Sequence, residues 1–206
     1  MKSLVRRATI NYSLKNRRRK AELILKFLDK RGIDSVLMVG VTGAEFDNNP
    51  LLPHNGLIEK LIAENHPVKM GINVVPAVTP YPFQIADARD MPFDDDFVDF
   101  ALANAVIEHV GGLLDQQRMV NEMTRVARSW VITTPNKWFP VESHTHVLFL
   151  HWLPAWRRRC NERRAKQGYS RFDLLSYWQF KALLPEDAVV HSRPWSPTFT
   201  ATYAKG

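Results

Sequence analysis

Short apolar runs alternate with stretches of helical periodicity along most of the chain. A helix is predicted over residues 18–31, where apolar side chains recur every three or four positions until Gly32. The uncharged run over residues 35–40 has the length of a strand and ends at a glycine. Such a run is typical of a buried strand in a parallel sheet.

The same alternation continues toward the C-terminus. Helical stretches are predicted over residues 56–65 and 113–127. Strands are predicted over residues 68–73, 83–86, 98–103, 130–134, 187–191 and 198–203. Strands that alternate with helices predict an α/β fold, a Rossmann-like, doubly wound and mostly parallel sheet. In such sheets ligands bind beyond the carboxyl ends of the strands, where the strand order reverses.

The link between the second and third predicted strands departs from this scheme. Residues 74–82 carry three prolines within seven positions, which exclude a regular helix. We therefore expect a shortened or irregular crossover here. At 206 residues the chain suggests one compact domain. We assign residues 1–32 to a basic, helical N-terminal extension and residues 33–206 to a single domain, with a cap or insert at about 138–180.

Composition narrows the class of protein. The chain is 45% apolar and 24% charged, and it has no run of about 18 uncharged apolar residues that could span a bilayer. The basic N-terminus lacks the apolar core of a secretory signal. Cys160 is the one cysteine, which excludes an internal disulfide. We therefore expect a cytoplasmic protein.

Charge is distributed unevenly along the chain. The net charge is +7, with Lys and Arg gathered in residues 1–31 and 129–206, while the middle is acidic. Basic ends suggest an anionic partner, namely a phospholipid, a phosphorylated substrate or RNA. The alternative is a solvated basic face.

The most specific motif runs from Phe83 to Val110. It reads FQIADARDMPF, then DDDFVDFALANAVIEHV. This segment resembles the DA-x-x-LPF, FD and EHV pattern of the type 11 methyltransferases, which are class I S-adenosylmethionine-dependent enzymes. The resemblance implies S-adenosylmethionine as cofactor, with Asp87 accepting a hydrogen bond from the adenine amino group and the Ala88 N–H meeting a ring nitrogen. It also implies that the last two strands form an antiparallel pair.

The glycine turn after the first predicted strand, in VLMVGVTG, resembles the loop that holds the methionine part of the cofactor in this family. The resemblance implies that Gly40, Thr42 and Gly43 bind the cofactor, because glycines let a backbone approach a ligand closely. The family usually has an acidic residue where Met38 stands, and one more glycine in the turn.

Two further cofactor positions follow from the same resemblance. Asn73 stands where the family normally presents an acid to the ribose hydroxyls, and its carbonyl can accept one such hydrogen bond without the charge. Asn104, at the end of the fourth predicted strand, completes the implied set.

The stretch TPNKWFPVESHTH, which ends at His146, resembles a loop on the substrate side of a bacterial branch of the family. A hydroxyl acceptor needs a proton acceptor within hydrogen-bond reach. The candidates are His144 first, then His109 and Glu142, each with a structural role as the alternative. The histidines 144, 146 and 151 lack a supporting acid or helical spacing, so we expect no metal site.

An aromatic and aliphatic stretch over residues 147–156 leads into Arg157, Arg158 and Arg159. Two interpretations remain open. One is an interfacial segment on an anionic membrane, at its inner face. The other is a cap helix packed over the active site with its arginines in water. Both suit an apolar or lipid-linked acceptor.

The leading hypothesis is S-adenosylmethionine-dependent methyl transfer to a small-molecule, saccharide or lipid-linked acceptor, at oxygen. The main alternative is a binding or regulatory protein on the same fold with a degenerate cofactor loop, since fold does not imply function. An RNA methyltransferase is a third hypothesis, supported by the basic ends but without interleaved base-stacking motifs. The sequence makes no prediction of oligomeric state.

Overall fold

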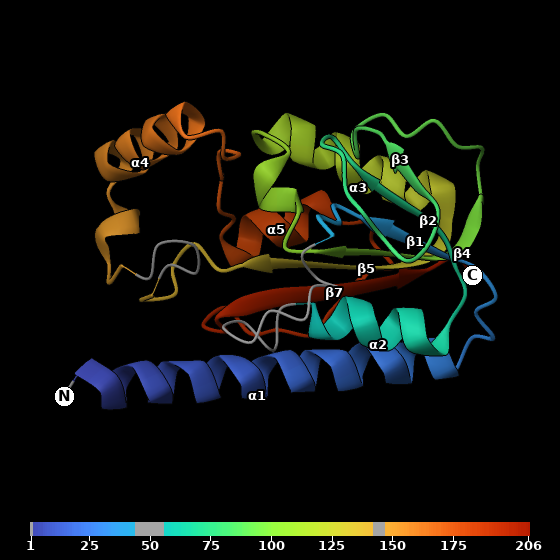
Figure 1. The fold of residues 1–206 in the computed structure, drawn as a ribbon, viewed down its shortest axis with the longest axis horizontal. Coiled ribbons are helices and arrows are strands. Elements are labelled where there is room, and N and C mark those ends of the chain that lie inside the picture. The colour runs from blue at the N-terminus through green and yellow to red at the C-terminus, as the bar shows by residue number, and fades with distance from the viewer. Residues whose placement is uncertain (1, 44–55, 142–146) are drawn as a thin grey trace.

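The computed structural model describes the backbone of residues 2–43, 56–141 and 147–206, and the side chains of these residues from Lys15 onward. Within these ranges one sheet lies between two layers of helices (Figure 1). Its strands are β1 (Val36–Val39), β2 (Val68–Asn73), β3 (Phe83–Ile85), β4 (Val98–Asn104), β5 (Ala127–Pro135), β6 (Val189–Val190) and β7 (Thr198–Ala204). The helices are α1 (Lys2–Asp29), α2 (Leu57–Asn65), α3 (Leu113–Val126), α4 (Pro154–Lys166) and α5 (Tyr177–Leu183), with 3-10 turns η1 (Ile107–His109) and η2 (Leu150–Trp152).

The strand order is β3-β2-β1-β4-β5-β7-β6. Strands β1 to β5 are parallel to one another, and β7 runs antiparallel to both β5 and β6. The order confirms the predicted doubly wound sheet and its antiparallel C-terminal pair. Because the order reverses between β1 and β4, the crevice for a ligand is expected where these two strands end.

Helices α1 and α2 cover one face of the sheet (Figure 1). The predicted helix over residues 18–31 is the second half of a longer one, α1. Its residues Ala21, Ile24 and Leu28 are buried together with Ile58 and Ile62 of α2. The second half of α1 is therefore part of the hydrophobic core.

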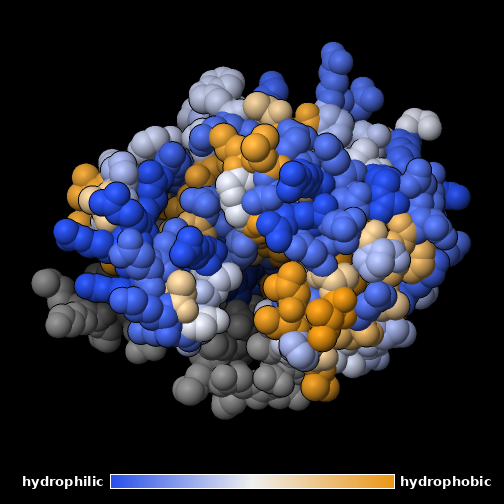
Figure 2. Space-filling view, turned by 90° about the horizontal axis from the view of Figure 1, so that it is seen from above, coloured by the Kyte–Doolittle hydropathy of each residue, from blue (hydrophilic) through white to orange (hydrophobic). Residues whose placement is uncertain are grey.

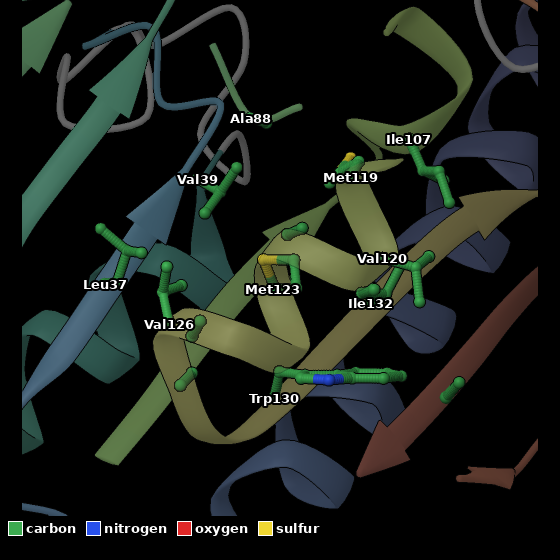
Figure 3. Close-up of a cluster of buried hydrophobic side chains, with 14 of the residues drawn as sticks. Leu37, Val39, Ala88, Ile107, Met119, Val120, Met123, Val126, Trp130 and Ile132 are labelled. Atoms are coloured by element: carbon green, nitrogen blue, oxygen red, sulfur yellow. The ribbon is translucent and has the colours of Figure 1, made fainter. Parts of the chain in front are cut away.

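Helix α3 covers the other face and builds the larger cluster of buried side chains (Figure 3). Met119, Met123 and Val126 follow the helical period and are fully buried, whereas Leu114 at its start is exposed. Trp130 of β5 is also buried, and its indole N–H donates to Thr124 Oγ1 at 3.0 Å. The buried indole thus has the hydrogen-bond partner that a polar group in a core requires.

The link over residues 74–82 contains no helix, as its prolines predict. It lies on the sheet and on the glycine turn. A Cβ atom at Gly71 would come within 2.7 Å of the Tyr81 ring, so this ring packs directly against β2. The crossover is therefore irregular in backbone but well packed.

Helices α5 and α4 differ in how they attach. Helix α5 begins with a capping box between Ser176 and Gln179, and Phe180 stacks on Phe199 of β7 with ring centroids 5.8 Å apart. Helix α4 begins with Pro154 at its first turn, and none of its residues, all of which the structure describes, is buried. It stands out beyond the end of β5 (Figure 1). No described helix is long and apolar enough to cross a bilayer.

Candidate active site

The loops after β1, β2, β3 and β4 meet at one edge of the sheet. Backbone hydrogen bonds join them: Gly40 donates to Ile72 at 2.8 Å and Ala86 donates to Asn73 at 3.0 Å. Ala105 donates to Thr133 of β5 at 3.0 Å. The edge therefore continues from the glycine turn to the end of β5. From above, a hollow separates the α4 side of the molecule from the rest of the surface (Figure 2).

Asp87 follows β3 and is held by Arg89. The guanidinium donates from Nη2 to Oδ2 at 2.6 Å and from Nε to Oδ1 at 3.0 Å, and the Arg89 N–H adds a bond of 2.9 Å to Oδ1. The hydrogen bond from the Arg89 side chain is the main reason why the pKa of Asp87 is lowered. Arg89 also reaches Asp115 of α3 at 3.4 Å. Asp87 is therefore a fixed carboxylate, and about a third of its side chain stays exposed.

Ala88 is buried, and among the hydrogen bonds of the described residues none is donated by its N–H. A fixed carboxylate beside an available backbone donor is the arrangement that an adenine edge requires. Asp87 and Ala88 therefore fit the adenosine part of the cofactor, and their role in binding it remains a prediction.

The glycines of the turn are explained by contacts within the chain. Gly40 and Gly43 have φ values of 79° and 83°, in the left-handed region that favours glycine. A Cβ at Gly40 would lie 2.4 Å from a methyl group of Val106, and one at Gly43 would lie 2.6 Å from the Val78 carbonyl oxygen. Thr42, between them, is exposed. Contacts within the chain therefore account for both glycines, and their predicted contact with the cofactor stays a prediction.

Asn73 ties the glycine turn to the end of β2. Its Nδ2 donates to the Val41 carbonyl at 2.8 Å, and its Oδ1 accepts from the Val74 N–H at 2.7 Å. Both ends of the carboxamide are thus engaged within the protein. The predicted bond to the ribose hydroxyls would use the remaining lone pair of Oδ1.

A polar cluster lies where β4 and β5 end, on the α1 and α2 face. Asn104 Nδ2 donates to Glu59 Oε1 of α2 at 2.7 Å. Asn104 Oδ1 accepts from Thr133 Oγ1 at 2.7 Å and from Lys20 Nζ at 3.3 Å. Lys20 Nζ also lies 3.4 Å from Thr133 Oγ1. We call Lys20, Glu59, Asn104 and Thr133 the amine cluster.

Lys20 is the unexpected member of this cluster. Burial of its amine lowers the pKa to about 8, against a smaller opposing effect of the Glu59 charge. Sequence analysis missed Lys20 because it lies in a run of basic residues. The signal was its position four and eight residues before Ile24 and Leu28, on the stripe of α1 that is buried.

The predicted proton acceptors are placed as follows. Glu142 and His144 lie outside the described residues. His109 Nδ1 is 2.8 Å from the Arg171 carbonyl oxygen and 3.2 Å from Ser170 Oγ, so its ring ties η1 to the segment before α5. The structure therefore places His109 shortly after β4, and its Nδ1 atom is engaged in hydrogen bonds within the chain.

Two further buried ionisable groups have atoms without hydrogen-bond partners in the described part of the chain. Glu108 of η1 accepts from Thr134 Oγ1 at 3.0 Å through Oε2, and its other oxygen has no hydrogen-bond partner within the described residues. His151 of η2 is fully buried, and neither ring nitrogen has a partner in the part of the chain that the structure describes. In that same part, no group of three His, Cys, Asp or Glu residues is arranged to hold a metal ion, and His146 lies outside it.

Comparison with known proteins agrees with this geometry. A family model described as a methyltransferase domain matches residues 63–130, which include Asp87, Ala88 and Asn104. No curated protein matches the sequence significantly.

Solved structures share the fold at low sequence identity. An S-adenosylmethionine-dependent methyltransferase of Methanosarcina mazei is 15% identical, with a TM-score of 0.51 over 84% of this chain and 92% of its own. Protein PH0226 of Pyrococcus horikoshii is 13% identical, with a TM-score of 0.55 over 90% and 87%. The N-methyltransferase NodS of Bradyrhizobium japonicum is 10% identical, with a TM-score of 0.53 over 92% and 96%.

The domain match includes the motif from Phe83 to Val110, and the shared fold extends over most of the chain. The chain therefore has the fold of solved methyltransferase structures, and its residues 63–130 match a methyltransferase domain.

Proposed function

We propose that the protein transfers a methyl group to a hydroxyl oxygen of a small-molecule, saccharide or lipid-linked acceptor. The observation that carries the proposal is the amine cluster. It places a titratable amine at the sheet edge where ligands of this fold bind. S-adenosylmethionine, when bound, supplies the methyl group on its sulfonium.

The chain's own residues have separate tasks in this proposal. Asp87 and Ala88 hold the adenine edge through a carboxylate and a backbone N–H. Asn104 holds the Lys20 amine at the end of β4, since its Oδ1 accepts from both Lys20 and Thr133. The Lys20 amine takes the proton of the acceptor hydroxyl while the oxygen gains the methyl group.

The protonation state of Lys20 supports a hydroxyl acceptor. An ordinary lysine is almost fully protonated at neutral pH and accepts no proton, whereas a pKa of about 8 leaves part of the amine neutral. Perturbed titratable groups gather at functional sites, because catalytic acids and bases need pKa values matched to their task. A buried amine beside the crevice is therefore better explained by chemistry than by packing.

One experiment tests both halves of the proposal. Calorimetric titration with S-adenosylhomocysteine should give measurable binding, and incubation with methyl-labelled S-adenosylmethionine and pooled glycolipid or saccharide acceptors should label a product. The label should resist acid and base, as a methyl ether does and a methyl ester does not. Absence of heat at millimolar ligand would contradict the enzyme hypothesis.

A second function, binding without turnover, is favoured by a different observation. Gly40 and Gly43 accommodate Val106 and Val78, and both ends of the Asn73 carboxamide are engaged within the chain. A regulatory protein that keeps the adenosine pocket but has lost methyl transfer would look like this. It would bind S-adenosylhomocysteine and label no acceptor, which separates it from the first proposal.

A further inference from the structure

Large apolar side chains are exposed in the segment that follows β5. Trp138, Leu148, Phe149, Leu150 and Leu153 are between 46% and 58% exposed, and we call them the apolar platform. They are gathered rather than scattered. Trp138 and Phe149 both pack edge-on against Trp152, with ring centroids 6.1 and 4.8 Å away. An apolar group of this kind on a protein surface indicates an interaction site.

Helix α4 attaches to the protein through one side only. Asn161 exchanges two hydrogen bonds of 3.0 Å with the Phe172 backbone, and Arg164 Nε donates to the Ser170 carbonyl at 3.0 Å. These residues lie on the partly buried side of the helix. The opposite side is exposed and carries Arg158, Arg159, Arg163 and Lys166, which we call the basic face; Glu162 is the single acid of α4.

The apolar platform and the basic face adjoin. Leu153 of the platform is the N-cap residue of α4. Lys137, next to Trp138, has its pKa lowered first by burial and then by the charge of Arg157, so the start of α4 lies close to the platform. Figure 2 shows the α4 side as largely hydrophilic, and Figure 1 places α4 beyond the end of β5.

We propose that the apolar platform and the basic face together dock on the surface of an anionic lipid bilayer. The apolar platform and the basic face match two regions of the bilayer surface. Indole, phenyl and leucine side chains enter the boundary between headgroups and acyl chains, while guanidinium and ammonium groups meet the lipid phosphates. Charge complementarity selects an anionic leaflet, such as the cytoplasmic one.

The structure argues against the alternative of a packed cap. The partly buried side of α4 bonds to Ser170 and Phe172, and no residue of Pro154–Lys166, a fully described segment, is fully buried. The docking surface lies at the end of β5, the same end of the sheet as the amine cluster. If the acceptor is lipid-linked, as the proposed function allows, docking would bring it to the site. Docking itself does not depend on methyl transfer.

Co-sedimentation of the full chain with vesicles tests the docking surface. We expect binding to vesicles of phosphatidylcholine with phosphatidylglycerol, little binding to phosphatidylcholine alone, and loss of binding between about 0.1 M and about 1 M salt as the Debye length falls from roughly 10 to roughly 3 Å. Neutralising the basic face should weaken binding by nearly a thousandfold, since each of its four charges contributes about 1 kcal/mol at such a surface. The variant is Arg158→Gln, Arg159→Gln, Arg163→Gln, Lys166→Gln.

A matched control removes as many exposed charges elsewhere. The control variant is Lys30→Gln, Arg118→Gln, Arg128→Gln, Lys181→Gln. It should keep nearly all of the vesicle binding, and equal losses in the two variants would overturn the assignment of the surface. A second variant, Leu150→Asn with Leu153→Asn, should lower binding about tenfold without changing net charge.

The remaining outcomes also decide the question. Folding of each variant is checked by circular dichroism and affinity for S-adenosylhomocysteine, neither of which should change. A chain that binds S-adenosylhomocysteine but no anionic vesicle contradicts docking and leaves the proposed function intact. Retention of single-stranded RNA in place of vesicles, lost in the basic-face variant, would overturn the membrane assignment in favour of RNA.

Discussion

The two sides of the candidate site use their polar atoms differently. On the β1–β2 side, Gly43 packs against the Val78 backbone. Both ends of the Asn73 carboxamide form hydrogen bonds, one to Val41 and one to Val74. On the β4–β5 side, the amine cluster keeps Lys20 at the sheet edge, although burial disfavours its charge. The first arrangement joins neighbouring loops, whereas the second holds an amine whose pKa is lowered by burial.

The difference separates residues that stabilise the fold from residues suited to a reaction. Contacts on the β1–β2 side can be explained by the stability of the chain. A desolvated amine is costly, and its retention points to a task other than stability. Changes on the β4–β5 side should therefore alter activity, and changes on the β1–β2 side should alter folding.

The largest expected effect is that of Lys20→Met on methyl transfer. Loss of a proton acceptor should lower kcat by about 10²–10⁴-fold. The rate of the natural protein should rise as pH passes through about 8, where the amine loses its proton, and the variant should lack this rise. Measurement of kcat against pH tests both points. Lys15→Met, an exposed change on the same helix, serves as control.

The same substitution has the opposite effect on stability. Because the folded state holds a pKa of about 8 against 10.5 unfolded, the unfolded chain binds more protons between these values, and stability rises with pH across that interval. Lys20→Met should remove this rise. Below pH 8 its free energy of unfolding should equal or exceed that of the natural protein, by up to about 2 kcal/mol after the lost hydrogen bonds are counted. Strong destabilisation in urea titrations would assign Lys20 a structural role.

The second effect concerns the adenine edge. Asp87→Ala removes a charged acceptor and should weaken binding of S-adenosylhomocysteine by roughly 10- to 100-fold, which corresponds to about 1.5–3 kcal/mol. Calorimetric titration measures the change, and Asp94→Ala, an exposed acid of the following turn, should leave affinity intact. An unchanged affinity in Asp87→Ala would refute the adenine assignment.

The smallest effect on ligand binding is expected at the glycine turn. In Gly43→Ala a Cβ would meet the Val78 carbonyl at 2.6 Å with φ at 83°, so the variant should lose about 1–3 kcal/mol of stability. Its affinity for S-adenosylhomocysteine, measured where it is folded, should change less than that of Asp87→Ala. A large loss of affinity at unchanged stability would reverse the comparison, because the glycine would then serve the ligand.

Local sequence patterns were sufficient to predict the strands and helices of the sheet. The apolar run before Gly40 and the helical stripe of Met119, Met123 and Val126 depend on run length and on the 3.6-residue period, which any segment carries in its own sequence. Three prolines similarly exclude a helix between β2 and β3 wherever that link lies. The motif from Phe83 to Val110 was recognised for the same reason, since its residues are contiguous.

The partners of these residues depended on the tertiary structure. Lys20 and Thr133 are far apart along the chain, and only the packing of α1 across the sheet brings them to Asn104. The Val78 backbone lies against Gly43, a contact that only the folded chain reveals. Local sequence determines which elements form, because backbone and hydrophobic period act over a few residues. The function of a polar side chain depends on what desolvates and pairs it, which the assembled sheet alone decides.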